Sequence, residues 1–302
     1  MTLNTTDLDK RTRIGKISGI VGILCNLVLS GGKIFVGKIS ASTSIMADGL
    51  NNLSDAVSSI VTLAGFKFAE KPADKKHPYG HARFEYLASL TISVLVLFMG
   101  FELAKTSIIK IIKPTPIEFS PVTIGVLIFS ILVKLFMMIY NYKLGRQIQS
   151  TTLLATAVDS RNDVIATSAV TAATLVEHFC DIKIDGFMGL VVSLFILYSG
   201  ISIAKDAISP LLGEAIDDKL QEELTEYVKS CPMIIDCHDL MVHDYGPGKR
   251  YASIHVEMDE SIHSRACHDM IDKVEQECLC RFGIHMVIHF DPVLVCEPEE
   301  DL

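Results

Sequence analysis

Long apolar segments alternate with short charged ones over the first two thirds of the chain, and this pattern ends near residue 210. A helix of about 20 apolar residues is long enough to cross a bilayer. Apolar windows of this length predict membrane spans at 14–37, 41–68, 83–105, 119–142, 152–178 and 185–206. The sequence therefore predicts an α-helical membrane domain with six transmembrane helices over residues 1–209.

The pattern after residue 210 is that of a soluble α+β domain, which we assign to residues 210–302. Helical spacing of apolar residues predicts a helix over 217–230, and Ser264 is expected to cap a second helix that ends near residue 281. Alternation predicts strands over 234–243, 250–258 and 285–291, the first two joined by a hairpin at 245–248. The order αββαβ indicates an open sheet covered by helices on one face, with His255 and His289 on the other.

Basic residues set the expected orientation, because cytoplasmic loops are enriched in Lys and Arg. They cluster before the first span, around the loop after the second span and after the fourth span. We therefore expect a multi-pass protein of the cell (plasma) membrane with both termini in the cytoplasm. The first apolar run follows a dozen polar residues and lacks a small-residue cleavage site, so we expect it to remain as a span.

Composition argues against a nucleic-acid partner. The formal net charge is −9, the acidic residues concentrate in the last third, and no basic stripe with interleaved aromatic residues occurs. The eight cysteines are scattered without a CxxC pair, and those of the last third are expected to lie in a reducing compartment. We interpret them as free thiols.

Two pairs of oxygen-bearing residues lie within predicted membrane spans: Asn51 with Asp55, and Asp159 with Asp163. A spacing of four places both members of a pair on one helix face. Acids buried together in a bilayer need a cation or protons to neutralise them, so they indicate a functional site for a transported cation. The alternative pair Asp48 and Asn52 has the same spacing on an overlapping face, and spacing alone does not separate the two.

Seven of the ten histidines lie after residue 210. Histidines with interspersed acids in about 90 residues form either a pH-sensitive surface or a set of divalent-metal ligands. We favour metal ligands, with a dimer interface nearby.

Three segments of the sequence form motifs: Asn51-Asn-Leu-Ser-Asp55, the loop Lys71-Pro-Ala-Asp-Lys-Lys-His-Pro-Tyr-Gly-His81, and Asp159-Ser-Arg-Asn-Asp163. Together they resemble the cation diffusion facilitator family of metal/proton antiporters. The resemblance covers nearly the whole chain. It implies six spans followed by a cytosolic αββαβ domain of the ferredoxin-like, metallochaperone-like kind, and a homodimer in the lipid bilayer.

The resemblance also implies three metal sites. The transport site is formed by Asn51, Asp55, Asp159 and Asp163, and the family's distance from this pair to the Pro-Ala-Asp loop favours Asn51 and Asp55 over Asp48 and Asn52. A second site in the loop uses Asp74, His77 and His81. A third site in the cytosolic domain uses His238, His255, His268, His289 and Asp291.

The ligand set of the transport site predicts its metal. Zinc-transporting members of the family place a histidine there, whereas this sequence supplies one amide and three carboxylates, and hard oxygen ligands favour Mn²⁺ over Zn²⁺. The resemblance is to the manganese-exporting branch, and efflux of Zn²⁺, Fe²⁺ or Cd²⁺ by the same mechanism is the alternative. No cofactor is expected beyond divalent metal ions as substrate and as ligands of the cytosolic domain. A metal-dependent membrane enzyme and a metal sensor without transport are the competing functional classes.

Overall fold

The computed structural model describes residues 5–39, 43–113, 121–180 and 184–294. The chain divides into two compact units. One contains residues 10–72 and 83–209. The other contains the described residues up to Asp9, residues 73–82 and the chain from Pro210 onward. The loop with the Pro-Ala-Asp sequence thus belongs mainly to the same unit as the C-terminal domain.

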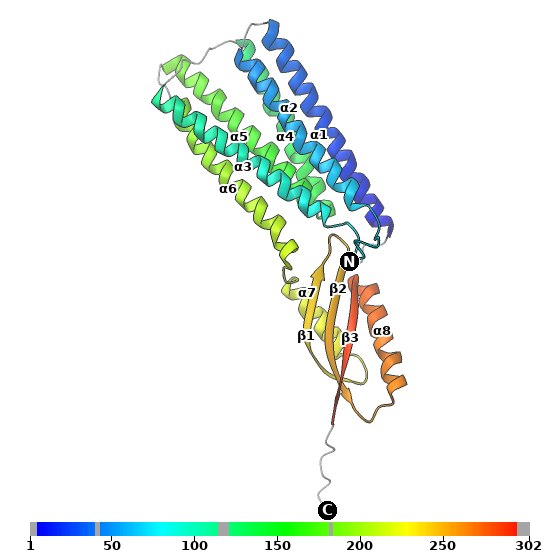
Figure 1. Cartoon of the computed structure of the whole chain (residues 1–302). Helices are drawn as coiled ribbons and strands as arrows, with labels where there is room; N and C mark the ends of the chain where they lie inside the picture. The colour runs from blue at the N-terminus through cyan, green and yellow to red at the C-terminus, as the bar shows by residue number, and fades with distance from the viewer. Residues whose placement is uncertain (1–4, 40–42, 114–120, 181–183, 295–302) are drawn as a thin grey trace, which may run out of the picture. The chain divides into compact units, whose positions relative to one another are not determined.

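The first unit is built from long helices (Figure 1). They are α1 (Thr5–Ile39), α2 (Thr43–Ala69), α3 (Phe84–Ile112), α4 (Pro121–Ile148), α5 (Thr151–Cys180) and α6 (Asp185–Leu212). Among the described residues, four of these helices, α1, α3, α4 and α6, are both long and apolar enough to cross a membrane. The other two, α2 and α5, are of comparable length, and they carry buried acids and hydroxyls among their apolar residues.

Helix α5 lies at the centre of the packing, with α2, α3 and α4 against it, and α2 also packs on α3. Helix α1 approaches α2 along small residues. A Cβ added at Gly19 would lie 2.9 Å from Leu63 Cβ and 3.0 Å from the Leu63 backbone nitrogen, and a Cβ at Gly15 would overlap the Phe66 ring. Small residues allow helix backbones to approach closely, which is how membrane helices gain packing contacts.

A buried ion pair joins the beginnings of α1 and α3. The Arg11 guanidinium donates to both carboxylate oxygens of Glu85, at 2.6 and 2.7 Å, and its Nε donates to the Ile148 carbonyl at 2.9 Å. The two side chains are 7% and 1% exposed. Arg11 therefore connects three segments of the bundle at one point.

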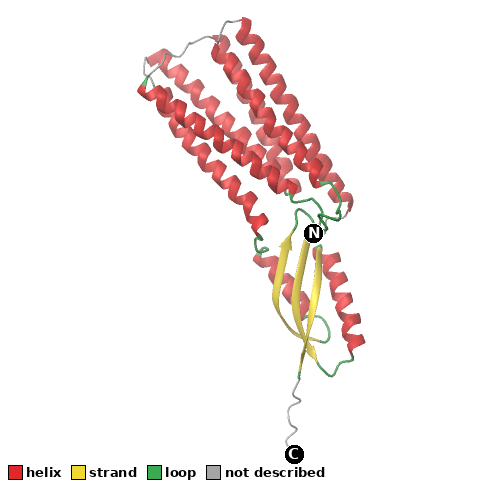
Figure 2. Cartoon of the chain, viewed as in Figure 1, coloured by secondary structure: helices red, strands yellow, loops and turns green. Residues whose placement is uncertain are grey.

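The second unit contains α7 (Asp218–Lys229), β1 (Ile234–Asp244), β2 (Arg250–Asp259), α8 (Ser264–Phe282) and β3 (Ile284–Val293), the predicted order αββαβ. The strands form one sheet in the order β1-β2-β3, drawn in yellow in Figure 2. The pair β1–β2 is antiparallel and β2–β3 is parallel. A parallel pair needs a crossover connection, which α8 provides.

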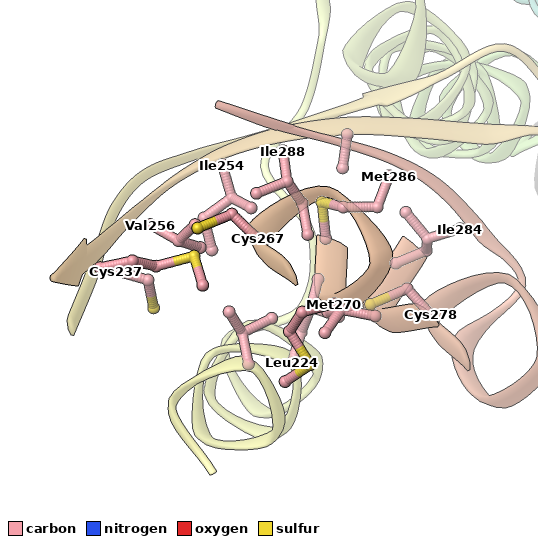
Figure 3. Packing of buried hydrophobic residues seen from close by; sticks show 14 residues of the cluster. Leu224, Cys237, Ile254, Val256, Cys267, Met270, Cys278, Ile284, Met286 and Ile288 are labelled. Atoms are coloured by element: carbon pink, nitrogen blue, oxygen red, sulfur yellow. The ribbon is translucent and has the colours of Figure 1, made fainter. Parts of the chain in front are cut away.

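Both helices cover the same face of this sheet. Leu224 of α7 and Met270 of α8 point toward Ile254 and Ile288 of the strands (Figure 3). Ile254 and Val256 of β2, which flank His255 in the sequence, are fully buried. This burial confirms the alternation predicted for the strand. The prediction that Ser264 caps α8 was wrong by one residue. Ser264 is the first residue of the helix, and the cap is His263, whose ring accepts a hydrogen bond from the Arg265 N–H.

Candidate metal centres

The acids of the membrane unit come from two helices that face each other. Asp55 lies on α2 and Asp159 on α5, and both are buried, at 2% and 6% exposure. Thr62 and Thr156, which lie elsewhere on the same two helices, share a hydrogen bond between their hydroxyls at 2.8 Å. This contact orients the polar faces of α2 and α5 toward each other, as the spacing of four predicted.

A lysine from a third helix joins these acids. The Lys134 ammonium of α4 donates to Asp55 Oδ2 at 2.8 Å and to Asp163 Oδ2 at 2.6 Å, and it also interacts electrostatically with Asp159. The side chains of Lys134, Asp55 and Asp163 are 4%, 2% and 13% exposed. The structure therefore brings Asp55, Asp159 and Asp163 together around one cationic group.

The side-chain amide of Asn52 is also hydrogen-bonded to this group of acids. Asn52 donates to Asp55 Oδ2 at 3.1 Å and accepts a hydrogen bond from Lys33 of α1. Asp55 Oδ1 is buried and has no hydrogen-bond partner among the described residues. The side chains of Asn51 and Asp48 lie outside the described residues, so Asn51 stays a predicted ligand.

The loop residues gather as the resemblance implied. Asp74, His77 and His81 present ligand atoms that all lie within 4.8 Å of one another. Asp74 Oδ1 accepts hydrogen bonds from the backbone N–H groups of His77 and Lys76, at 2.7 and 2.8 Å. The His77 N–H is the main reason why the pKa of Asp74 lies below its ordinary value, so this carboxylate keeps its negative charge. Gly80, at φ 86°, closes the turn between the two histidines.

An aromatic cluster holds this loop against the hairpin of β1 and β2. The Tyr79 ring stacks on Tyr245 with centroids 4.2 Å apart and meets Tyr251 edge-on at 5.1 Å. Tyr251 in turn stacks on His285 of β3 at 5.0 Å.

Three histidines form a row across the uncovered face of the sheet. The strand register pairs His238 of β1 with His255 of β2, and His255 with His289 of β3. Two residues further along β2 and β3, the register pairs Glu257 with Asp291. Neighbouring strands lie about 4.8 Å apart, so in-register side chains on one face fall within reach of a single ion.

The ligand atoms of His238, His255 and Asp291 meet within 4.8 Å of one another. His255 Nδ1 donates to Asp291 Oδ2 at 2.9 Å, and His238 Nε2 lies 3.5 Å from the same oxygen. The hydrogen bond from His255 holds the pKa of Asp291 below its ordinary value, and the neighbouring histidines add to this effect. His289 lies at the edge of the cluster, with Nε2 3.4 Å from Asp291 Oδ1.

His268 is the predicted ligand that the fold does not bring to this cluster. It lies on α8, and its Nε2 is 3.5 Å from Asp272 Oδ2, with the imidazole 70% exposed. Helix α8 covers one face of the sheet, and the row of histidines lies on the opposite face. In the described structure, His268 therefore does not meet the histidines of the row in the same chain.

Residues 19–212 match the family described as the cation efflux transmembrane domain. The chain belongs to the cation efflux family. Residues 216–293 match the family described as the cytoplasmic domain of cation efflux proteins. The resemblance to cation diffusion facilitators is thereby confirmed: this is a membrane transporter with a cytoplasmic C-terminal domain and not an enzyme.

Curated relatives are similar to this protein over most of its length. This cation efflux protein is 33% identical over 251 residues to an uncharacterised transporter of Methanocaldococcus jannaschii, covering 83% of this chain and 88% of the relative. It is 31% identical over 268 residues to the cation-efflux pump FieF of Salmonella newport and of Salmonella typhimurium, covering 88% of this chain and 89% of each pump.

Lys134 is the residue of this cation efflux protein that reasoning from the sequence missed. It is the single charged residue of the predicted span 119–142, and an ionisable residue within a span indicates a functional site by default. The lone charge in an apolar span could therefore have marked Lys134 as a candidate. Its partners could not be predicted, because they depend on how α4 packs against α2 and α5.

Proposed function

We propose that this cation efflux protein exports Mn²⁺ from the cytoplasm in exchange for protons, through six membrane-spanning helices. Residues 1–209 form the transport domain in this proposal, and residues 210–302 form a metal-binding, dimerising domain. Both termini lie in the cytoplasm and the protein resides in the cell membrane.

The observation that carries the proposal is the convergence of three acids from the facing helices α2 and α5. Asp55 and Asp159 are buried, and the side chain of Asp163 is 13% exposed. One of their oxygens, Asp55 Oδ1, is buried without a hydrogen-bond partner in the described structure. A buried carboxylate oxygen without a donor costs free energy unless a cation or proton meets it. Asp55, Asp159 and Asp163 supply carboxylates to the ion, and Asn51 adds an amide oxygen.

The chemistry of these ligands favours manganese. Carboxylate and amide oxygens suit Mn²⁺, whereas Zn²⁺ prefers nitrogen or sulfur ligands. Efflux of Zn²⁺, Fe²⁺ or Cd²⁺ by the same mechanism remains the alternative substrate choice.

Proton exchange gives the export its driving force. Moving one positive charge outward against an inside-negative membrane costs about 2.3 kcal/mol per 100 mV. Protons that enter from outside compete for the carboxylate oxygens, release the metal there and return on the acids. The counter-movement of protons offsets the electrical cost of exporting the metal.

The cytoplasmic unit is proposed to sense the exported metal. Loop residues Asp74, His77 and His81 offer one site, and His238, His255 and Asp291 offer another, with His289 at its edge. His268 joins this set only as a ligand supplied to a neighbouring protomer. The match to the cytoplasmic domain of cation efflux proteins supports a homodimer.

Flux measurements in proteoliposomes test the proposal. With an imposed proton gradient, the wild-type protein should accumulate Mn²⁺, and Asp163→Asn should reduce the rate at least about tenfold because the ion loses a charged ligand. Glu102→Gln is the matched control, since Glu102 lies in α3 and pairs with Lys105 at 3.4 Å, outside the acid cluster.

The outcomes separate the competing functions. Mn²⁺ uptake that ignores the proton gradient contradicts antiport, and binding of Mn²⁺ without any flux indicates a sensor. Wild-type transport of Zn²⁺ in preference to Mn²⁺ contradicts the choice of metal. Asn51→His should shift the preference toward Zn²⁺, and an unchanged ratio counts against Asn51 as a ligand.

A further inference from the structure

Helix α4 buries one narrow stripe of residues in the interior of the bundle, and three of them are polar. Its buried residues recur at steps of three or four along the helix: Ser130, Lys134, Met137, Asn141 and Gly145. A lysine near a helix end can extend to the membrane surface. Lys134 instead lies near the middle of α4 and is 3% exposed, so its ammonium stays inside the protein.

The ammonium occupies the place between the carboxylates of α2 and α5. Its distances of 2.8 Å to Asp55 Oδ2 and 2.6 Å to Asp163 Oδ2 are those of charge-assisted hydrogen bonds. Both acceptor oxygens belong to residues that the proposed function assigns to the transported ion. An ion bound by Asp55 and Asp163 together must compete with Lys134 for them.

We propose that Lys134 is a tethered competitor of the transported metal and a determinant of its selectivity, an inference that rests on the proposed transport site. Without metal, the ammonium neutralises part of the acid cluster. A divalent cation displaces it, and the flexible four-carbon stem of lysine lets the ammonium move away while α4 stays in place.

This competition explains why a divalent ion is favoured. A monovalent cation brings no more charge to the carboxylates than the ammonium that it has to displace, and it lacks the tether that holds Lys134 nearby. A divalent cation brings twice the charge and gains more from the same oxygens. The lysine therefore weakens the binding of all cations but excludes monovalent ones more strongly.

Equilibrium binding to the purified full-length protein tests the inference. The background carries His77→Ala and His255→Ala, which remove ligands of the two cytoplasmic clusters, so that calorimetry with Mn²⁺ reports on the membrane acids. Lys134→Met should tighten Mn²⁺ binding by about tenfold or more, and high Na⁺ should compete with Mn²⁺ in this variant far more than in the lysine-bearing background. Lys134→Arg, which keeps the charge, should stay within about threefold of the background.

Lys105→Met is the matched control, because Lys105 is exposed on α3 and pairs with Glu102. Its loss should leave Mn²⁺ affinity unchanged. The proposed competition is overturned if Lys134→Met binds Mn²⁺ no more tightly than the background does. It is also overturned if Na⁺ competes with Mn²⁺ equally weakly in both proteins. Either result leaves the proposed transport site intact. Mn²⁺ binding that is absent both in the background and in Lys134→Met, or that Asp163→Asn does not weaken, instead contradicts the proposed function.

Folding of the variant provides a second readout. If the acids need a cation, Mn²⁺ should raise the thermal midpoint of Lys134→Met more than that of the background, and a variant that is recovered only with Mn²⁺ supports the inference. Failure of both Lys134→Met and Lys134→Gln to fold with Mn²⁺ present overturns it, since metal then does not substitute for the ammonium.

Discussion

The pair of Arg11 and Glu85 illustrates how much a single residue contact can contribute to the membrane unit. Removing one partner of a buried ion pair leaves an uncompensated charge and costs about 3–5 kcal/mol. Glu85→Gln should therefore lower the apparent thermal midpoint of the purified protein clearly. Thermal unfolding in detergent, followed by intrinsic tyrosine fluorescence or circular dichroism, measures the change.

The control is Glu102→Gln, which breaks the exposed pair with Lys105 and should cost no more than about 1 kcal/mol. Replacing both Arg11 and Glu85 by Met should recover much of the loss, because neither charge of this buried pair remains. Equal destabilisation by Glu85→Gln and Glu102→Gln would show that the buried pair contributes little.

Local spacing was sufficient to predict that the polar faces carrying Asp55, Asp159 and Asp163 meet, and these residues stay predicted ligands. It did not reveal Lys134, for a physical reason. Asp55, Asp159 and Asp163 share helix faces because the α-helical period fixes side-chain direction from sequence alone. The contacts of Lys134 are set by the packing of α4 against two helices remote in sequence, which no local period encodes. His268 was assigned through the family resemblance, whereas α8 holds it beside Asp272.

At the level of the element, the contact between α1 and α2 depends on glycine. The Leu63 backbone leaves no room for a Cβ at Gly19, and overpacking of this kind costs about 1–3 kcal/mol. Gly19→Ala should therefore lower the thermal midpoint, although alanine favours helix more than glycine does.

Gly31 of the same helix provides the comparison, because a Cβ there meets no atom within 4 Å. Gly31→Ala should be neutral or stabilising by up to about 1 kcal/mol. Destabilisation by Gly31→Ala equal to that by Gly19→Ala would show that helix flexibility, and not close approach, is what glycine contributes to α1.

The elements of the C-terminal unit were largely predictable, since the period changes from helical to alternating where each strand begins. The sequence did not reveal the irregularity in β1, where the register shifts between His238 and Met241 and Asp239 adopts a φ of 52°. A bulge follows from pairing between strands, and alternation within one strand does not specify it.

At the scale of the whole molecule, a loop between two helices of the membrane unit is part of the cytoplasmic unit. Tyr79 holds it there through stacked and edge contacts, each worth about 0.5–1.5 kcal/mol beyond burial. Tyr79→Ala should release the loop and accelerate hydrogen exchange at the Asp74 and Gly80 amides, which both bond to the His77 carbonyl. It should also weaken the metal binding that we propose for Asp74, His77 and His81.

Tyr79→Phe keeps the ring and should retain wild-type exchange, measured by mass spectrometry on the full chain. Unchanged exchange in Tyr79→Ala would mean that the turn hydrogen bonds alone fix the loop. A rise in both variants would assign the effect to the phenol hydroxyl instead.

The parallel pairing of β2 with β3 has a consequence for the folding of the cytoplasmic unit. His255 and Asp291 lie side by side in space, but the chain between them runs through the whole of α8. A cation bound to His238, His255 and Asp291 therefore cross-links all three strands and closes long loops of chain, as a disulfide does at a gain of about 2–4 kcal/mol. In the proposed function, metal bound there would act as a reversible cross-link, and the stability of this unit would follow the concentration of the exported ion.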